Sequence, residues 1–109
     1  MLTLVPTNSF EKDARRLLDE REYDGLLQWL AKNPMAGPVI KGTGGLRKVR
    51  IARQDGGKSG GVRVIYYFHA EDKPILLLLI YAKANQQNLT ARQKRVLRKL
   101  VTGIYGEIT

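Results

Sequence analysis

The sequence changes its pattern at residues 46–52, which read LRKVRIA. Basic and apolar residues alternate in this stretch, with Lys48 and Arg50 in one phase and Val49 and Ile51 in the other. Because successive side chains of a β-strand point to opposite faces of the sheet, this alternation predicts a half-buried strand. Its exposed face carries positive charge.

Two further strands are predicted along the chain. Residues 62–69, VRVIYYFH, are rich in β-branched and aromatic side chains, which are typical of strands. Residues 75–82, ILLLLIYA, are almost wholly apolar, which indicates a strand with neighbours on both sides and a covered face.

The phases of these strands gather basic and aromatic side chains on one face. If Val49 and Ile51 face the helices, then Val64, Tyr66 and Phe68 can face them from the next strand. The open face is then shared by Lys48, Arg50, Arg63, Ile65, Tyr67, Tyr81 and Lys83. Cations on such a face bind phosphates, and tyrosine rings can stack on unpaired bases. The alternative interpretation is an ordinary solvated sheet face.

Helical patterns flank the strands. Residues 2–5 predict an edge strand ended by Pro6. Apolar residues then recur at helical spacing over 10–18, after a cap at Asn8 or Ser9, and again from about residue 20 or 22 to residue 31. Residues 19–23 predict a break or tight turn between these helices. Thr90 is expected to cap a final helix.

The order β-α-α-β-β-β-α predicts an α+β fold. We expect a mostly antiparallel sheet of about four strands, with the helices packed on one face. Since no repeat or linker interrupts residues 1–109, a single domain is expected.

The positive charge lies almost wholly beyond the first predicted helices. The 109 residues carry a formal net charge of +9, and residues 41–109 hold all of the excess. Two basic clusters, over residues 41–63 and 92–99, predict an anionic partner. Nucleic acid is the first candidate, and an acidic membrane surface or an acidic protein are the alternatives.

Composition excludes several classes of protein. The absence of cysteine excludes disulfides, thiolate zinc sites and cysteine nucleophiles. The longest apolar run, residues 75–82, is far shorter than the ~20 residues of a membrane helix, and no export signal is visible. A cytoplasmic protein without membrane association is therefore expected.

Two apparent motifs have simpler interpretations. Residues 52–59, ARQDGGKS, satisfy a loose phosphate-binding pattern, but a strand follows where such a loop needs a helix. We interpret them as a glycine-rich hairpin loop with Lys58 at its tip. The lone His69 has no partner carboxylate at a readable spacing, which favours a structural or solvated role over a general base.

Three stretches closely resemble a known family. They are GTGGLRKVR (residues 42–50), GKSGGVRVIYY (57–67) and IYAK (80–83), with Leu89 and Thr90 after the last. They resemble the HigB branch of the RelE/ParE toxin superfamily over nearly the whole chain. This resemblance implies a RelE-like fold and a bacterial toxin of a type II toxin–antitoxin system.

The resemblance also implies a reaction, which is ribosome-dependent cleavage of mRNA in the A site without metal or other cofactor. The 2′-hydroxyl attacks the adjacent phosphodiester and leaves a 2′,3′-cyclic phosphate and a 5′-hydroxyl. Catalysis is assigned to Lys48, Arg50, Arg63, Lys83 and Tyr67. Together with the basic clusters, the resemblance assigns RNA binding to Arg47, Lys58, Tyr81, Arg92, Arg95, Arg98 and Lys99.

The proton carriers stay open at this point. Relatives often have a further arginine and a tyrosine where this chain has Ala84 and Thr90. Tyr67, Tyr81 or Tyr105 can replace that tyrosine. We expect a lysine or a tyrosine with a lowered pKa to move the protons, or else groups of the substrate and the ribosome.

The expected partners are mRNA, the ribosome with its rRNA, and an antitoxin. The resemblance implies a HigA-like antitoxin with a helix-turn-helix domain, a monomeric free toxin and a hetero-oligomer with the antitoxin. Two other functions remain as alternatives. One is a ParE-like toxin that inhibits DNA gyrase without nuclease activity, and the other is a plain RNA-binding module.

Overall fold

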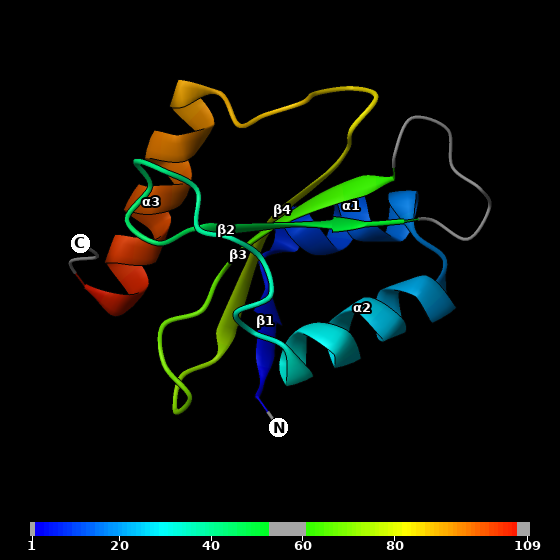
Figure 1. Cartoon of the computed structure of the whole chain (residues 1–109), viewed down its shortest axis with the longest axis horizontal. Helices are drawn as coiled ribbons and strands as arrows, with labels where there is room; N and C mark the ends of the chain where they lie inside the picture. Colours follow the sequence, from blue (N-terminus) through cyan, green and yellow to red (C-terminus); the bar gives the residue numbers. More distant parts are fainter. Residues whose placement is uncertain (1, 53–60, 107–109) are drawn as a thin grey trace.

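The computed structural model describes residues 2–52 and 61–106 (Figure 1). Within these ranges the strands and helices follow one another in the predicted order. They are β1 (Leu4–Pro6), α1 (Asn8–Leu17), α2 (Glu20–Lys32), β2 (Arg47–Ile51), β3 (Val62–Tyr67), β4 (Ile75–Ala82) and α3 (Ala91–Tyr105). The predicted α+β class is confirmed.

The described strands form one sheet in the order β1-β4-β3-β2. β1 runs parallel to β4, and the other neighbours are antiparallel, which confirms a mostly antiparallel sheet. A bulge shifts the register between β3 and β4, because Ile65 pairs with Leu79 while Tyr66 pairs with Leu77. Leu78 is therefore an extra residue, and it contributes to the same core as Tyr81.

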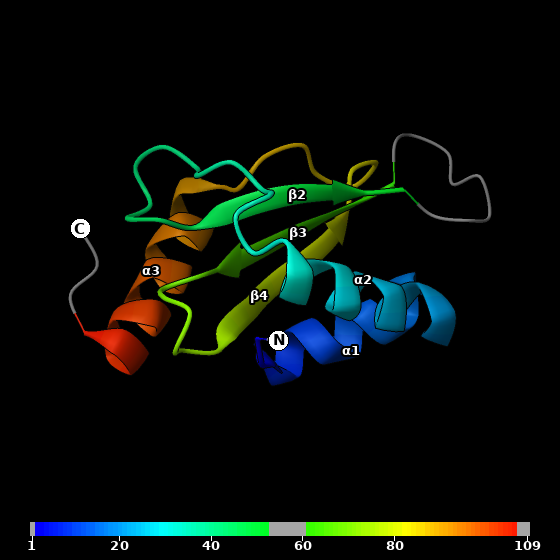
Figure 2. The same ribbon diagram turned by 60° about the horizontal axis from the view of Figure 1, so that its bottom comes forward.

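Helices α1 and α2 lie together on one face of the sheet (Figure 2). Phe10 of α1 and Leu30 of α2 belong to the same buried core as Val64 and Tyr66 of β3. These strand residues have the phase predicted for the core. Arg63 lies between Val62 and Val64, which both belong to this core, and therefore points to the opposite face.

Helix α3 covers that opposite face, so the prediction that the helices share one face is wrong. Leu97 and Val101 of α3 belong to a second core, with Ile65, Leu76 and Leu78 of the sheet. The reason is that β3 and β4 carry apolar side chains on both faces, and each face must be shielded from water. In both views α3 lies at the end of the molecule away from α2 (Figures 1 and 2).

The helix caps differ in part from the prediction. Thr7, rather than Asn8 or Ser9, caps α1, because its hydroxyl accepts the Phe10 N–H at 3.0 Å. The predicted break at residues 19–23 is shorter than expected, since Asp19 and Glu22 form a capping box that starts α2. The cap residue Thr90 and the edge position of the first strand are confirmed. In the described ranges, no helix is both long and apolar enough to span a bilayer.

Candidate functional site

Three side chains form a row across three strands. Arg50 of β2 pairs with Arg63 of β3, and Arg63 pairs with Tyr81 of β4. By strand alternation, all three point to the face opposite α1 and α2. Paired residues of adjacent strands have Cβ atoms about 4.5–5.5 Å apart, so both guanidinium groups can reach a single phosphate. We call Arg50, Arg63 and Tyr81 the Arg–Arg–Tyr row.

Two lysines lie beside this row. Lys48 precedes Arg50 by two residues in β2, and it pairs with Ile65. The backbone N–H of Lys83 donates to the Gly61 carbonyl at 3.1 Å, which extends the ladder past the end of β4. Both lysines are half-buried, whereas Arg50 is exposed. The structure thus sets Arg50 beside Arg63 and places Lys48 and Lys83 at opposite ends of the row, each two residues along the chain from a member of the row.

Gly61 supports the register of the row. Its φ is +76°, a conformation that favours glycine, and an added Cβ would collide with the Ile51 carbonyl oxygen. This close approach adjoins the pair Ile51 and Val62, and the next pair along the ladder is Arg50 and Arg63. The backbone at Gly61 therefore helps to align the two arginines.

The loop after α2 supports the other end of β2. The Gly37 N–H donates to the Tyr66 hydroxyl at 2.9 Å, and that hydroxyl donates to the Pro34 carbonyl at 2.8 Å. A Cβ on Gly37 would lie 2.6 Å from the Lys48 carbonyl oxygen. The loop is thus seated directly against the backbone of Lys48.

Arg47, predicted to bind RNA, takes part in this support. It pairs with Tyr66, whose side chain lies in the core on the α1 and α2 side of the sheet. Its guanidinium donates to the Gly37 carbonyl at 2.7 Å and to the Met35 carbonyl at 3.3 Å. The structure therefore separates Arg47 from the row, and we leave it out of the candidate site.

Tyr81 differs from the two arginines of the row because its hydroxyl group is buried. Tyr81 is 8% exposed, and its hydroxyl oxygen has no hydrogen-bond partner among the residues that the structure describes. Burial raises the pKa of Tyr81 above its ordinary value of 10.0, and the charge of Arg63 opposes this shift. Tyr81 is therefore a neutral hydrogen-bond donor at pH 7, which corrects the expectation of a tyrosine with a lowered pKa.

Tyr67 and Tyr105 pack in the same core as Tyr81, but their hydroxyl groups are engaged away from the row. The Tyr67 hydroxyl is 3.0 Å from Nδ1 of His69, whose ring stacks on Tyr105 with centroids 4.8 Å apart. The Tyr105 hydroxyl donates to the Pro74 carbonyl at 2.6 Å. Tyr67 also lies about 13 Å along β3 from Arg63, at ~3.3 Å per residue. The structure does not bring these tyrosines to the row, and His69, which is exposed, contacts both of them.

The second basic cluster lies on α3, apart from the row. Its exposed members are Arg92, Arg95, Arg98 and Lys99. The spacing of three and four residues places Arg92, Arg95 and Lys99 along one side of the helix, whereas Arg98 lies on another side. Lys58 lies outside the described residues, as does most of the predicted hairpin loop, from residue 53 to residue 59.

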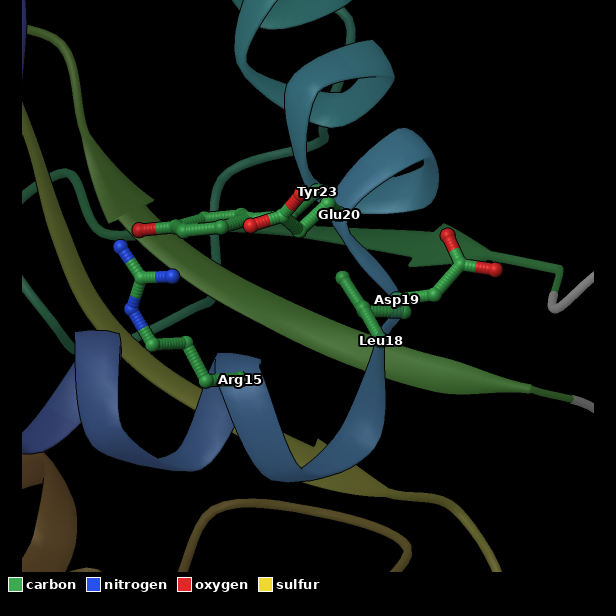
Figure 3. Close-up of a pocket in the computed structure, with 5 residues that line it drawn as sticks. All are labelled: Arg15, Leu18, Asp19, Glu20 and Tyr23. Atoms are coloured by element: carbon green, nitrogen blue, oxygen red, sulfur yellow. The ribbon is translucent and has the colours of Figure 1, made fainter.

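A small hollow of about 200 Å³ lies at the turn between α1 and α2. Figure 3 shows Arg15 reaching from α1 toward the Tyr23 ring, whose centroid is 5.8 Å from the guanidinium carbon, while the Asp19 carboxylate points away. Asp19 accepts the Glu22 N–H at 2.7 Å and so caps α2, while the contact of Arg15 with Tyr23 joins the two helices. Within the described part of the chain, no group of three or more His, Asp or Glu side chains is placed to hold a metal ion.

A comparison with protein families agrees with the fold. Residues 7–107 match the family model described as the RelE toxin of the RelE / RelB toxin-antitoxin system. The match begins at the cap of α1 and includes the Arg–Arg–Tyr row and both lysines. The chain belongs to the RelE toxin family. This confirms the toxin class inferred from the sequence, and assignment to the HigB branch stays a prediction.

Proposed function

We propose that this toxin is an endoribonuclease that cleaves mRNA in the ribosomal A site and thereby inhibits translation. The observation that carries the proposal is the direct pairing of Arg50 with Arg63 on a sheet face that α1 and α2 do not cover. Rigid strands hold these two fixed cations beside Tyr81. Such preorganised donors stabilise charge that develops on a phosphate.

The proposed reaction needs no cofactor. The 2′-oxygen of one nucleotide attacks the adjacent phosphorus, its proton passes to a base, and the bond from phosphorus to the 5′-oxygen breaks as that oxygen takes a proton. The products are a 2′,3′-cyclic phosphate and a 5′-hydroxyl. Arg50 and Arg63 bind the non-bridging oxygens, whose negative charge increases in the pentavalent transition state. The need for a 2′-hydroxyl restricts the reaction to RNA.

The remaining side chains of the site supply protons and hydrogen bonds. Tyr81 keeps its proton at neutral pH because burial raises its pKa. Its hydroxyl is buried in the free chain, so we assign it a hydrogen bond to the phosphate or to the leaving oxygen that forms once RNA binding uncovers this group. Lys48 and Lys83 are the amines beside the row, and we assign to them the transfer of protons to and from the RNA.

Further partners are proposed from the positive charge of α3 and from membership of a toxin–antitoxin family. The exposed basic side chains of α3 add to the positive field that attracts RNA, so rRNA as well as mRNA is a proposed contact. We further propose a HigA-like antitoxin with a helix-turn-helix domain, which forms a hetero-oligomer with a toxin that is monomeric when free. The proposed site of action is the bacterial cytoplasm.

The decisive experiment is inducible expression with mapping of mRNA 5′-ends. The wild-type chain is expected to arrest growth and to produce codon-aligned cuts in translated mRNA, while purified protein leaves naked RNA intact. Arg63→Ala should abolish the cuts. Arg16→Ala is the matched control, because it removes the same charge from α1, on the opposite face of the sheet.

The alternative functions give different results in the same experiment. Growth arrest with DNA damage and intact mRNA would replace the proposal with inhibition of gyrase. Binding to naked RNA with a steep salt dependence, and no effect on growth, would identify a plain RNA-binding module.

A further inference from the structure

An apolar stripe on α3 is left exposed. Val96, Leu100 and Ile104 are 57%, 40% and 53% exposed. Their spacing of four residues places them along one side of the helix. The contacts of α3 with the sheet are made by other residues, Leu97 and Val101, which are buried. The exposed stripe is therefore not needed to attach α3.

A groove runs beside this stripe and has a volume of about 350 Å³. It is lined by Val96 and Leu100 of α3, by Leu78 and Leu79 of β4, and by Thr7 and Ser9 at the start of α1. From Gln93 to Leu100 its α3 side is about 11 Å long, at ~1.5 Å per residue, which matches two turns of a partner helix.

Basic side chains border the stripe on its outer side. Arg92 lines the groove, and Arg95 and Lys99 continue along the same side of α3. The sequence of α3 contains no acidic residue. On the opposite side, the N-terminus of α1 adds the positive end of a helix dipole. An occupant of the groove would therefore meet positive charge along both edges.

We propose that this groove binds an amphipathic helix of a partner protein. Apolar side chains of that helix would fill the groove, and its acidic side chains would lie opposite Arg92, Arg95 and Lys99. This is recognition of a helix in an apolar groove, with flanking charges that select the partner as they do in coiled coils. The proposal does not depend on the nuclease function, because no residue of the Arg–Arg–Tyr row lines the groove.

Two other occupants fit the groove less well. Single-stranded RNA is held by aromatic side chains that stack on its bases, whereas the residues that line this groove are aliphatic or polar, with one arginine. A second copy of the chain would bring another basic α3 against the first, and like charges oppose such a contact. An acidic helix satisfies both the apolar and the charged parts of the surface.

The test uses two synthetic helical peptides and the full-length protein. Both peptides carry leucine at the a and d positions of about three heptads, with glutamate at e and g in one and lysine in the other. Fluorescence anisotropy measures binding, and NMR locates it. We expect the glutamate peptide to bind at least about tenfold more tightly than the lysine peptide and to shift the methyl signals of Val96 and Leu100.

Matched variants separate the groove from general attraction to a basic protein. Leu100→Glu places a charge in the groove and should weaken the glutamate peptide about tenfold or more. Val39→Glu makes the same change of charge at another exposed apolar residue and should have an effect below about twofold. Equal losses in the two variants, or no binding by wild type, would overturn the proposal.

Binding of RNA or of a second copy of the chain to the groove would give different experimental results. A single-stranded RNA that shifts the Val96 and Leu100 signals more than the peptide does would assign the groove to RNA. Light scattering that shows a dimer of the free chain, disrupted by Leu100→Glu, would assign it to a second copy. Either result overturns the proposal, and neither bears on mRNA cleavage.

Discussion

Arg50 and Arg63 lie directly opposite each other on adjacent antiparallel strands. Like charges at such positions repel, and a phosphate bound between them would replace the repulsion with charge-assisted hydrogen bonds. The pair is thus suited to binding an anion rather than to holding the sheet together. Val62 and Val64, on the other face of β3, are fully buried and supply that stability.

Replacement of Arg63 by alanine should separate activity from folding. We expect cleavage of ribosome-bound mRNA to fall about 100-fold or more, because a fixed donor to the phosphate is lost. The melting temperature should stay within ~2 °C of wild type, as expected for a change that leaves the buried core intact. Arg63→Lys keeps the charge but loses the two-pronged donor, so an intermediate rate is expected. Wild-type activity of Arg63→Ala would remove Arg63 from the mechanism.

Replacement of Tyr81 by phenylalanine should slow cleavage without loss of stability. The hydroxyl has no hydrogen-bond partner among the described residues, so its removal should leave the free energy of unfolding unchanged or raise it by about 1 kcal/mol. The cleavage rate should fall about tenfold, since one hydrogen bond to the RNA is lost.

Tyr67→Phe is the matched control for Tyr81→Phe. It removes a hydroxyl bonded to His69 and should lower stability by about 1 kcal/mol while cleavage stays normal. Chemical denaturation and single-turnover cleavage measure the two effects. The reverse pattern, with cleavage reduced only in Tyr67→Phe, would contradict our placement of the site.

Arg47→Ala should act on stability, despite its position next to Lys48. The variant leaves the carbonyls of Gly37 and Met35 without their guanidinium donor and weakens the attachment of the loop to β2. We expect a loss of about 1–3 kcal/mol in the free energy of unfolding. The salt dependence of RNA binding should match that of wild type, because this arginine does not neutralise a phosphate. A shallower salt dependence in the variant would show that Arg47 does neutralise a phosphate of the RNA.

Gly61→Ala should disturb the alignment of the two arginines. The new Cβ would meet the Ile51 carbonyl at a φ that favours glycine, at a cost of about 1–3 kcal/mol. Cleavage should fall as well, since Arg63 is displaced from Arg50. Gly103→Ala is the control: its Cβ would enter open space within α3, and it should stabilise the protein by roughly 0.5–1 kcal/mol. Equal effects of the two changes would argue against strain at Gly61.

The protein should lose stability in alkaline solution. Burial raises the pKa of Tyr23, Tyr66, Tyr67, Tyr81 and Tyr105 above the ordinary value of 10.0. Because the folded pKa exceeds the unfolded one, the stabilising contribution is complete below pH ~10 and is lost as the pH rises through the folded values. Urea midpoints measured between about pH 9 and pH 12 should fall, and tyrosinate absorbance should rise with unfolding. A constant midpoint would show that these phenols ionise equally in both states.

Strand phase could be predicted from the sequence because it is a local property. Lys48 and Arg50 alternate with apolar neighbours in one strand, and Arg63 lies between Val62 and Val64 in the next. Arg47 has a role that could not be predicted from strand phase. It lies in the same basic run, but its partners are carbonyls of a loop that precedes it in the chain and reaches it only in the folded protein.

Tyr67 shows the same limit. It shares the phase of Arg63, so the sequence favours a place on the open face. In the fold, α3 covers that part of the face, and the Tyr67 hydroxyl is engaged by His69. The apolar character of β4 was a signal for a second covered face, because a strand that is apolar at successive positions must be buried on both sides.

The alternation of side chains along each strand already assigned Lys48, Arg50 and Arg63 to one face, since a period of two residues needs only the local backbone. Three features required the complete fold. They are the register that sets Arg50 opposite Arg63, the burial of the Tyr81 hydroxyl, and the face chosen by α3. Each depends on contacts between segments far apart in the chain, and packing, rather than local conformation, decides such contacts.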